Sequence, residues 1–333
     1  MNNVYSPRVK VSSSGASHVT DAADYLRIGS NVWTETGAAL NGDSATQGVF
    51  TYDDTSVFNV DLAAANYNVS VDLANPTSAD VTVNLIAEDL TKATVVVPAN
   101  STSTVSTYLI SLIDNQLNLK FEAASTATTA DTAAAGYAYV KSVAITQEAA
   151  KSAGSKPTIY IASDSTVQTY DSNIYPQAGW GQELFKYFTG ADGMVESATT
   201  AGYSQSRKCE LSSAIIENRA IGGRSSKSFI DEGKLNSILN SIRPGDYLFV
   251  QWGDNDATYT RPNRYVSSAD FHTYLQKYID GAKQRGATCV LVTPPPRYTF
   301  SNGVCGISFL DYRQVMLDMA AAQNIPVLEG RIF

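Results

Sequence analysis

Ser165 lies where a nucleophile would be useful. An apolar run of β type at 158–162 stops at Ser163, Asp164 and Ser165, and a helix-like segment at 182–188 follows after a loop. At the carboxyl end of a buried strand in an open α/β sheet, side chains project into the crevice where such folds bind ligands. The Ser165 hydroxyl is therefore a candidate nucleophile. Serine, aspartate and threonine after a strand are also ordinary turn and capping residues, so a simple turn is the alternative interpretation.

The second half of the chain alternates between expected strands and expected helices. The pattern predicts strands at 214–216, 247–251, 288–293 and 325–328, and helices at 230–242, 268–285 and 309–323. This βαβα order predicts a parallel sheet that is covered by helices on both faces, with any site at the carboxyl ends of the strands.

Two of these strand ends carry residues that suit the hydrolysis of an ester. Gly223 follows the segment 214–216, and Asn255 follows the strand expected at 247–251. A serine esterase needs hydrogen-bond donors for the oxyanion that forms on the ester carbonyl. The N–H groups of Ser165 and Gly223 and the side-chain amide of Asn255 are donors of the right type at the right places.

The first half has a different pattern and predicts a β-sandwich over residues 1–147, joined to the rest by a small, polar linker at 148–157. Its clearest alternating segments are 67–73, 81–86, 117–121 and 137–145. Four aromatic residues, Tyr25, Trp33, Tyr52 and Tyr67, suit either a sugar-stacking platform or the core, and we expect the core. His18 stands alone in a polar stretch, which predicts a surface loop.

Composition limits the classes of function. A chain of 333 residues suggests two domains. It is 44% hydrophobic and 17% charged, with no apolar run approaching the ~20 residues of a membrane span, which predicts a globular protein with no membrane partner. A net charge of -8 argues against nucleic acid as a partner. The amino terminus lacks the pattern of a signal peptide, so we expect either no export or a signal peptide that has been removed.

The three cysteines are Cys209, Cys289 and Cys305, and their spacing is not of a metal-binding type. Cys289 lies inside an apolar run, where we expect a small buried side chain, and a bridge between Cys209 and Cys305 remains open. We expect neither a metal nor a cofactor.

Three ordered motifs resemble those of the SGNH (GDSL-type) hydrolases and, within them, the rhamnogalacturonan acetylesterases. The motif S-D-S-T at 163–166 resembles the first block, with Ser163 where the family usually has glycine. The motif A-I-G-G-R-S-S at 220–226 resembles the second block, and G-D-N-D at 253–256 resembles the third, although Asp254 often corresponds to histidine in close relatives. The resemblance covers about 156–328.

This resemblance implies a three-layer α/β/α fold with a flavodoxin-like parallel sheet and the removal of acetyl groups from pectic polysaccharide. It makes Ser165 the nucleophile, with Asp164 in support, and makes Gly223 and Asn255 the oxyanion donors. A β-sandwich ahead of the catalytic domain is familiar in such carbohydrate esterases. The expected partner is an acetylated acidic plant polysaccharide, and the expected location is extracellular. Another acyl ester as substrate is the alternative.

The fourth block of the family, a D-x-x-H pair that supplies the base and its orienting carboxylate, has no counterpart in this sequence. The second histidine, His272, lies beside the apolar face of an expected helix, and we expect a surface or boundary residue. Without a base, Ser165 is a poor nucleophile. Three explanations are open: a carboxyl-terminal truncation, which we favour, a second polypeptide that supplies the segment, or a degenerate hydrolase that only binds carbohydrate.

Cationic residues gather near the proposed site of this acidic chain: Arg207, Lys208, Arg224, Lys227, Arg261 and Arg264. A guanidinium suits the carboxylate of a uronic acid through paired hydrogen bonds. Arg224, Arg261 and Arg264 are therefore candidates for substrate binding, and solvated surface charges or internal ion pairs with Asp231 and Glu232 are the alternative.

Overall fold

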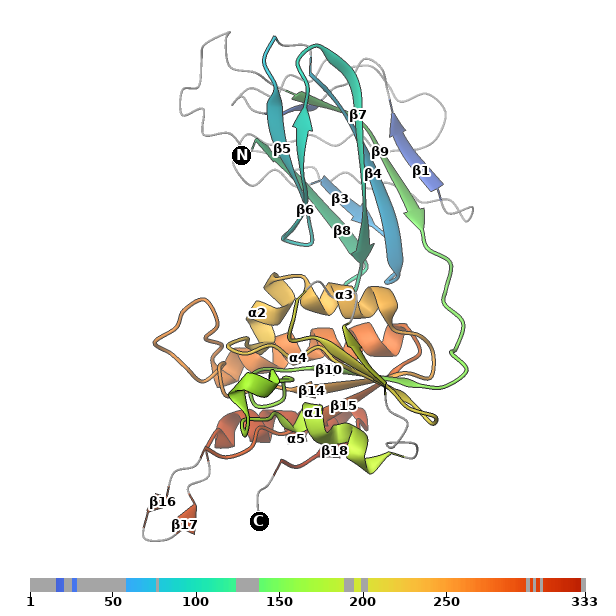
Figure 1. Ribbon diagram of the computed structural model, residues 1–333. Helices are drawn as coiled ribbons and strands as arrows, with labels where there is room; N and C mark the ends of the chain where they lie inside the picture. The colour runs from blue at the N-terminus through green and yellow to red at the C-terminus, as the bar shows by residue number, and fades with distance from the viewer. Residues whose placement is uncertain are drawn as a thin grey trace. The chain divides into compact units, whose positions relative to one another are not determined.

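The computed structural model divides the chain into two compact units, Met1–Ala149 and Ala150–Phe333, which are drawn in Figure 1. The structure describes residues 16–20, 26–28, 58–75, 78–123, 138–188, 195–198, 203–297, 300–301, 304–305 and 308–330. Among these, no helix combines the length and apolar character that crossing a membrane requires.

The described residues of the first unit form strands that pair in two antiparallel sheets. One sheet has the order β1-β9-β4-β7, with β2 also paired to β9, and the other has the order β3-β8-β5-β6. The strands are β1 (Ala16–Thr20), β2 (Leu26–Ile28), β3 (Phe58–Asp61), β4 (Asn66–Asn75), β5 (Val81–Ala87), β6 (Leu90–Val97), β7 (Ser101–Ser111), β8 (Gln116–Ala123) and β9 (Ala138–Gln147).

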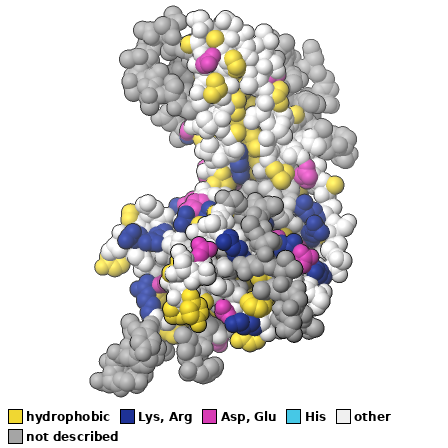
Figure 2. Space-filling view, in the orientation of Figure 1, with side chains coloured by type: hydrophobic (Ala, Val, Ile, Leu, Met, Phe, Trp, Pro, Cys, Tyr) yellow, Lys and Arg dark blue, Asp and Glu magenta, His cyan; other side chains and the backbone are white. Residues whose placement is uncertain are grey.

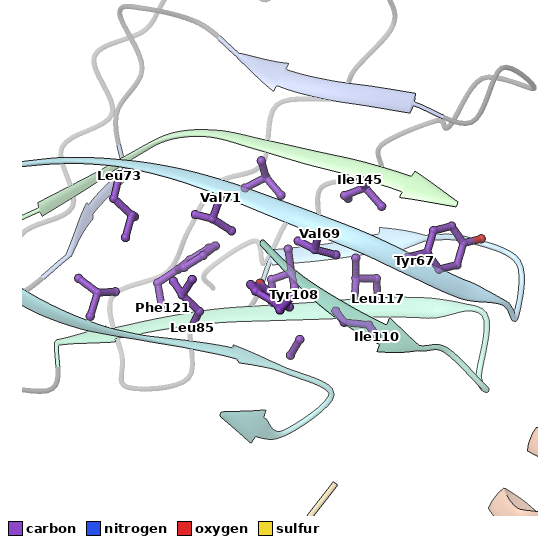
Figure 3. Packing of buried hydrophobic residues seen from close by; sticks show 14 of the residues in the cluster. Tyr67, Val69, Val71, Leu73, Leu85, Tyr108, Ile110, Leu117, Phe121 and Ile145 are labelled. Carbon is purple, nitrogen blue, oxygen red and sulfur yellow. The ribbon is translucent and has the colours of Figure 1, made fainter. Parts of the chain in front are cut away.

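The two sheets of the first unit share one apolar core, part of which is seen in Figure 3. Along β4, buried and half-buried residues alternate, because successive side chains of a strand point to opposite faces. Val69 and Val71 of β4 pack in the same cluster as Leu85 and Leu117 of the other sheet. Each fully buried aliphatic side chain of this kind contributes roughly 1.5–3 kcal/mol to folding.

Tyr67 is 2% exposed and belongs to this cluster, so the expectation that it lies in the core is confirmed. Tyr25, Trp33 and Tyr52 lie outside the described residues. His18 is in strand β1, where it pairs with Ala144, so the expectation of a loop was wrong.

The second unit is built on a seven-stranded sheet of order β11-β12-β13-β10-β14-β15-β18. The strands are β10 (Thr158–Ala162), β11 (Val195–Ala198), β12 (Arg207–Glu210), β13 (Ile215–Asn218), β14 (Tyr247–Gln251), β15 (Thr288–Val292) and β18 (Val327–Leu328). Those from β13 to β18 are parallel to one another. Strands β11 and β12 are antiparallel, so the expected parallel sheet is in fact a mixed sheet of mostly parallel strands. A small hairpin of β16 (Phe300–Ser301) and β17 (Val304–Cys305) lies apart from it.

Helical segments join the strands of the second unit. They are η1 (Ser172–Ile174), α1 (Trp180–Glu183), η2 (Leu184–Tyr187), α2 (Ser226–Asp231), α3 (Lys234–Ser241), α4 (Ser268–Gln284) and α5 (Leu310–Gln323). Figure 1 shows α3 and α4 on one face of the sheet and α1 on the other. On the α1 face, Ile159 and Ile161 of β10 pack with Trp180 and Leu184.

The single helix expected at 230–242 is two helices, because Gly233 takes a left-handed conformation with φ of 72° between α2 and α3. Helix α2 also begins earlier than expected, because Ser225 caps its amino end. Its Phe229 packs on Trp252 with ring centroids 5.3 Å apart, and Trp252 packs on Tyr278 of α4 at 5.9 Å. These aromatic contacts fix α2 and α4 against the end of β14.

Candidate active site

The three motif residues Ser165, Gly223 and Asn255 follow three adjacent parallel strands. Strand β10 lies between β13 and β14 in the sheet, and the chain leaves β10 to one side before returning to the other. Such a change of direction opens a crevice at the carboxyl ends of the strands, which is the usual ligand site of an open α/β sheet. The topology therefore brings the three residues to one edge of the sheet.

Hydrogen bonds continue the alignment of these strands beyond their ends. The N–H of Ile221 donates to the carbonyl of Ser163 at 2.9 Å, which joins the segment after β13 to the segment after β10. The buried Ser163 hydroxyl donates to the carbonyl of Gln251 at 2.8 Å, which joins it to β14. The backbone before Ser165 is thus held from both sides.

Ser165 itself is half-buried at the start of a turn. Its carbonyl accepts a hydrogen bond from the Tyr170 hydroxyl at 2.7 Å. The loop after β13 comes close on the other side, because a Cβ atom built on Gly222 would lie 3.5 Å from Cβ of Ser165. The N–H of Gly222 donates to Gln168 Oε1 at 2.5 Å, so this amide is already in use.

Gly223 differs from its neighbour in both conformation and hydrogen bonding. Its φ is 78°, in the left-handed region that favours glycine. Within the described part of the chain, the N–H groups of Gly223 and Ser165 donate to no acceptor. An oxyanion hole needs donors that are held in place but not yet used, and these two amides have that property.

Asn255 is held at both ends of its side-chain amide. Its Nδ2 donates to the carbonyl of Arg224 at 2.9 Å, and its Oδ1 accepts from Nη1 of Arg264 at 3.0 Å. An amide nitrogen carries two hydrogens, of which one contacts the Arg224 carbonyl, and a side-chain hydrogen bond from Asn255 lowers the pKa of the neighbouring Asp164.

Asp164, the residue before the candidate nucleophile, is 1% exposed. Its Oδ1 accepts from the N–H of Thr166 at 2.9 Å and from the Thr166 hydroxyl at 2.7 Å. Burial raises the pKa of Asp164 to about 6, and the hydrogen bonds from Thr166 oppose this rise. Asp164 therefore orders the turn that contains Ser165.

Asp256 follows Asn255 and is fully buried. Its carboxylate accepts from the N–H of Ser226 at 3.0 Å, from the Ser226 hydroxyl at 2.5 Å and from the N–H of Gly253 at 3.1 Å. Burial raises the pKa of Asp256 to about 7, although these hydrogen bonds oppose the rise. The residue ties the segment after β13 to the segment after β14.

The three arginines expected to bind substrate have different surroundings. Figure 2 shows Lys and Arg side chains spread over the visible face of the second unit. The Arg224 side chain is occupied by groups of the protein itself, because its Nε lies 3.1 Å from both carboxylate oxygens of Glu232 and its Nη1 donates to the carbonyl of Gly222 at 3.0 Å. Arg264 contacts Gly223 and Asn255, whereas Arg261 is exposed. The alternative of an internal ion pair with Glu232 therefore holds for Arg224, and a substrate contact stays a prediction for Arg261.

Asp254, where close relatives often have histidine, pairs with Arg297, whose Nε donates to Oδ1 at 2.9 Å. His272 is exposed near the start of α4, and its Nδ1 contacts the carbonyl of Ala269, as expected for a surface residue. Cys289 is buried as expected, and burial raises the pKa of its thiol to about 12. Among the described residues, no group of three or more His, Cys, Asp or Glu side chains is arranged to hold a metal ion.

Sequence reasoning missed two glutamines that organise the site. Gln168 holds Gly222, and Gln251 accepts from Trp180 Nε1 at 2.7 Å while donating to the Thr166 hydroxyl at 2.6 Å. Gln251 stood inside the expected strand, and its polar side chain at the end of an apolar run is the signal that could have identified it.

Comparisons with known proteins also indicate an esterase. No protein-family model matches the chain. The chain is 40% identical over 172 residues to the probable rhamnogalacturonan acetylesterase YesY of Bacillus subtilis, which covers 51% of this chain and 69% of that protein. It is 30% identical over 172 residues to the rhamnogalacturonan acetylesterase RhgT of the same organism, covering 51% of this chain and 63% of RhgT.

A longer but weaker match is the uncharacterized esterase YxiM of Bacillus subtilis, 28% identical over 296 residues, with 88% of this chain and 67% of YxiM covered. The crystal structure of YxiM has a TM-score of 0.42 to this chain at 25% identity, over 95% of this chain and 77% of that one. These relatives are esterases. The match to YesY, at 40% identity over more than two thirds of its length, shows that the chain belongs to the rhamnogalacturonan acetylesterase family.

Proposed function

We propose that the protein is a serine esterase that removes acetyl groups from rhamnogalacturonan, a pectic polysaccharide, outside the cell. The family relationship supports the substrate. The observation that carries the proposal is that Ser165, Gly223 and Asn255 follow three adjacent parallel strands. Among the described residues, the backbone N–H groups of Ser165 and Gly223 have no hydrogen-bond acceptor. The SGNH resemblance of the three motifs assigns the same roles.

In the proposed reaction, Ser165 Oγ attacks the acetyl carbonyl carbon, and the carbonyl oxygen becomes an oxyanion. The N–H groups of Ser165 and Gly223 and the Asn255 amide stabilise this oxyanion. The intermediate then releases the sugar hydroxyl, which takes up the proton that Ser165 lost, and leaves an acetyl-serine. Water hydrolyses this ester to acetate and regenerates Ser165.

The proton from Ser165 needs a base, and the sequence contains two histidines. His272 is exposed with its Nδ1 against the carbonyl of Ala269, and neither histidine has an aspartate three residues before it, as a D-x-x-H pair requires. The proposal therefore assigns the base to residues outside these 333, on the same or a second polypeptide. Loss of the base from a serine triad lowers turnover on the order of a million-fold, leaving the ~10³–10⁴-fold acceleration of the oxyanion hole and binding.

A second candidate function is carbohydrate binding without turnover, in which the first unit holds the polysaccharide. The absence of a D-x-x-H pair from the sequence favours it. The two candidates predict different responses to an added base, because imidazole in solution can take the proton from Ser165 when no side chain does so.

The test measures acetate release from acetylated rhamnogalacturonan by the chain with and without imidazole. We expect release that rises with imidazole and disappears in Ser165→Ala, while His272→Ala behaves as the wild type. A fluorophosphonate should label Ser165, as mapped by mass spectrometry. Equal release by Ser165→Ala, or labelling at another residue, would refute the assignment. Polysaccharide binding without imidazole-dependent release would establish the second candidate.

A further inference from the structure

One atom of Arg264 touches both of the proposed donor residues that lie outside the Ser165 turn. Its Nη1 donates to the carbonyl oxygen of Gly223 at 2.9 Å and to Oδ1 of Asn255 at 3.0 Å. The two contacts join the loop after β13 to the loop after β14. Both come from a charged donor, and such hydrogen bonds are stronger than those between neutral groups.

The contact with Asn255 fixes which end of the amide carries the donors. A guanidinium has only donors, so the atom of Asn255 that faces Arg264 must be the oxygen. The Nδ2 atom consequently lies at the other end of the amide, where it donates to the carbonyl of Arg224 at 2.9 Å. The positive charge of Arg264 beside Oδ1 also draws electron density from the amide and makes its N–H a better donor to an anion.

The contact with Gly223 acts on the backbone. A Cβ atom at Gly223 would lie 3.0 Å from Nη1 of Arg264, so the arginine packs directly on this glycine. The carbonyl of Gly223 is held by Arg264, and the N–H of Gly223 donates to no acceptor in the described part of the chain. Arg264 thus fixes the residue through one group and leaves the other for a ligand.

The charge of Arg264 also has different surroundings from that of Arg224. Arg224 is paired with Glu232, whereas no carboxylate of the described residues forms an ion pair with Arg264. Backbone hydrogen bonds hold the loop that carries Arg264. The N–H of Arg264 donates to the carbonyl of Arg261 at 3.1 Å, and the N–H of Val266 donates to the carbonyl of Asp256 at 3.1 Å. A half-buried charge without a counter-ion is available to an anion that forms nearby.

We propose that Arg264 is a positioning residue of the oxyanion hole, which orients Asn255 and Gly223 and adds uncompensated positive charge, in place of the substrate contact expected from the sequence. This inference rests on the proposed function for its chemistry, and on the two hydrogen bonds for its geometry. It predicts that Arg264 acts through Asn255, so that the two residues are not independent.

The kinetic test follows imidazole-assisted hydrolysis of p-nitrophenyl acetate by the chain. We expect Arg264→Met to lower kcat by about 10- to 100-fold with little change in KM, which is at or below the ~10²–10³-fold cost of losing an oxyanion donor itself. Arg264→Lys should recover part of this loss. In an Asn255→Ala background, Arg264→Met should cost about threefold or less, because contacting residues are not additive. Arg243→Met, which removes an exposed arginine just before the amino end of β14, is the matched control.

Equal losses in the wild-type and Asn255→Ala backgrounds, or a change confined to KM, would overturn the inference. A structural measurement separates its failure from failure of the proposed function. The side-chain amide resonances of Asn255, assigned by their loss in Asn255→Ala, should shift in Arg264→Met together with the backbone amide of Gly223, and remain in place in Arg243→Met. Unchanged resonances in Arg264→Met would refute the positioning role even if the chain hydrolyses esters. If Ser165→Ala leaves hydrolysis intact but these resonances shift, the proposed function fails and the geometry stands.

Discussion

The carboxylate of Asp256 accepts two hydrogen bonds from Ser226, one from its backbone N–H at 3.0 Å and one from its hydroxyl at 2.5 Å. Ser226 is the first residue of helix α2, and Asp256 lies next to Asn255. One buried side chain therefore sets the distance between the helix that follows Gly223 and the loop that contains the proposed amide donor. Its ionisation should affect both stability and the site.

Our first prediction concerns pH and Asp256. Burial raises the pKa of Asp256 from 3.8 to about 7, so the folded protein holds the proton more tightly than the unfolded chain. The stabilisation from this group is present in full below about pH 4 and is lost as the pH rises through 7. Between about pH 4 and 7, the free energy of unfolding of the wild type, measured by denaturant titration, should therefore fall relative to that of Asp256→Asn. A change in favour of the wild type would mean that the three hydrogen bonds outweigh burial.

The second prediction uses two glycines with similar backbones. Gly223 has φ of 78° and Gly245 has φ of 85°, but a Cβ atom would contact Arg264 only at Gly223 and would meet nothing within 4 Å at Gly245. Both alanine variants should lose roughly 1–2 kcal/mol of unfolding free energy, because a left-handed backbone disfavours a side chain. Only Gly223→Ala should also slow the labelling of Ser165 by a fluorophosphonate. Equal labelling rates in the two variants would refute the assignment of Gly223 to the oxyanion hole.

The third prediction concerns substrate charge. Arg261 is exposed in the same loop as Arg264, and among the described residues its side chain has no hydrogen-bond or ion-pair partner. A uronate carboxylate is a suitable partner for it. Arg261→Ala should lower kcat/KM by about two- to fivefold on acetylated rhamnogalacturonan, the usual range for an exposed ion pair, and not on acetylated xylan. Arg243→Ala is the control, and equal losses on both polysaccharides would exclude recognition of the acid.

Strands buried on both faces were the part of the fold most open to prediction. Strands β10 and β14 have the bounds that their apolar runs predicted. A strand that is covered on both faces has a nearly continuous apolar sequence, and the run ends where the strand ends. Strands β11 (V-E-S-A), at the edge of the sheet, and β12 (R-K-C-E), next to it, were missed, because their charged and small residues leave no apolar pattern. The strand β7 in the first unit was missed for a similar reason, since its first half is almost entirely serine and threonine.

The site shows the same division. Ser165, Gly223 and Asn255 could be placed at strand ends because chain order and parallel pairing determine which ends meet. The contacts of Arg264 could not be predicted, since they depend on a turn in which the N–H of Arg264 donates to the carbonyl of Arg261 and its side chain reaches two other loops. Sequence shows that an arginine is near a site, but contact geometry decides whether it faces the substrate or the protein.

The two consecutive glycines of the second motif have separate reasons to be glycine. A Cβ atom at Gly222 would lie 3.0 Å from Gln168 Oε1, so this position is limited by the space between two loops, whereas Gly223 is limited by its backbone conformation. Mutational tolerance should therefore differ within the pair. A change at Gln168 that shortens the side chain can open room for alanine at 222, but no change in a neighbouring side chain relieves the backbone at 223. In the evolution of such a site, the first glycine is replaceable together with its partner, and the second is replaceable only if the loop itself is rebuilt.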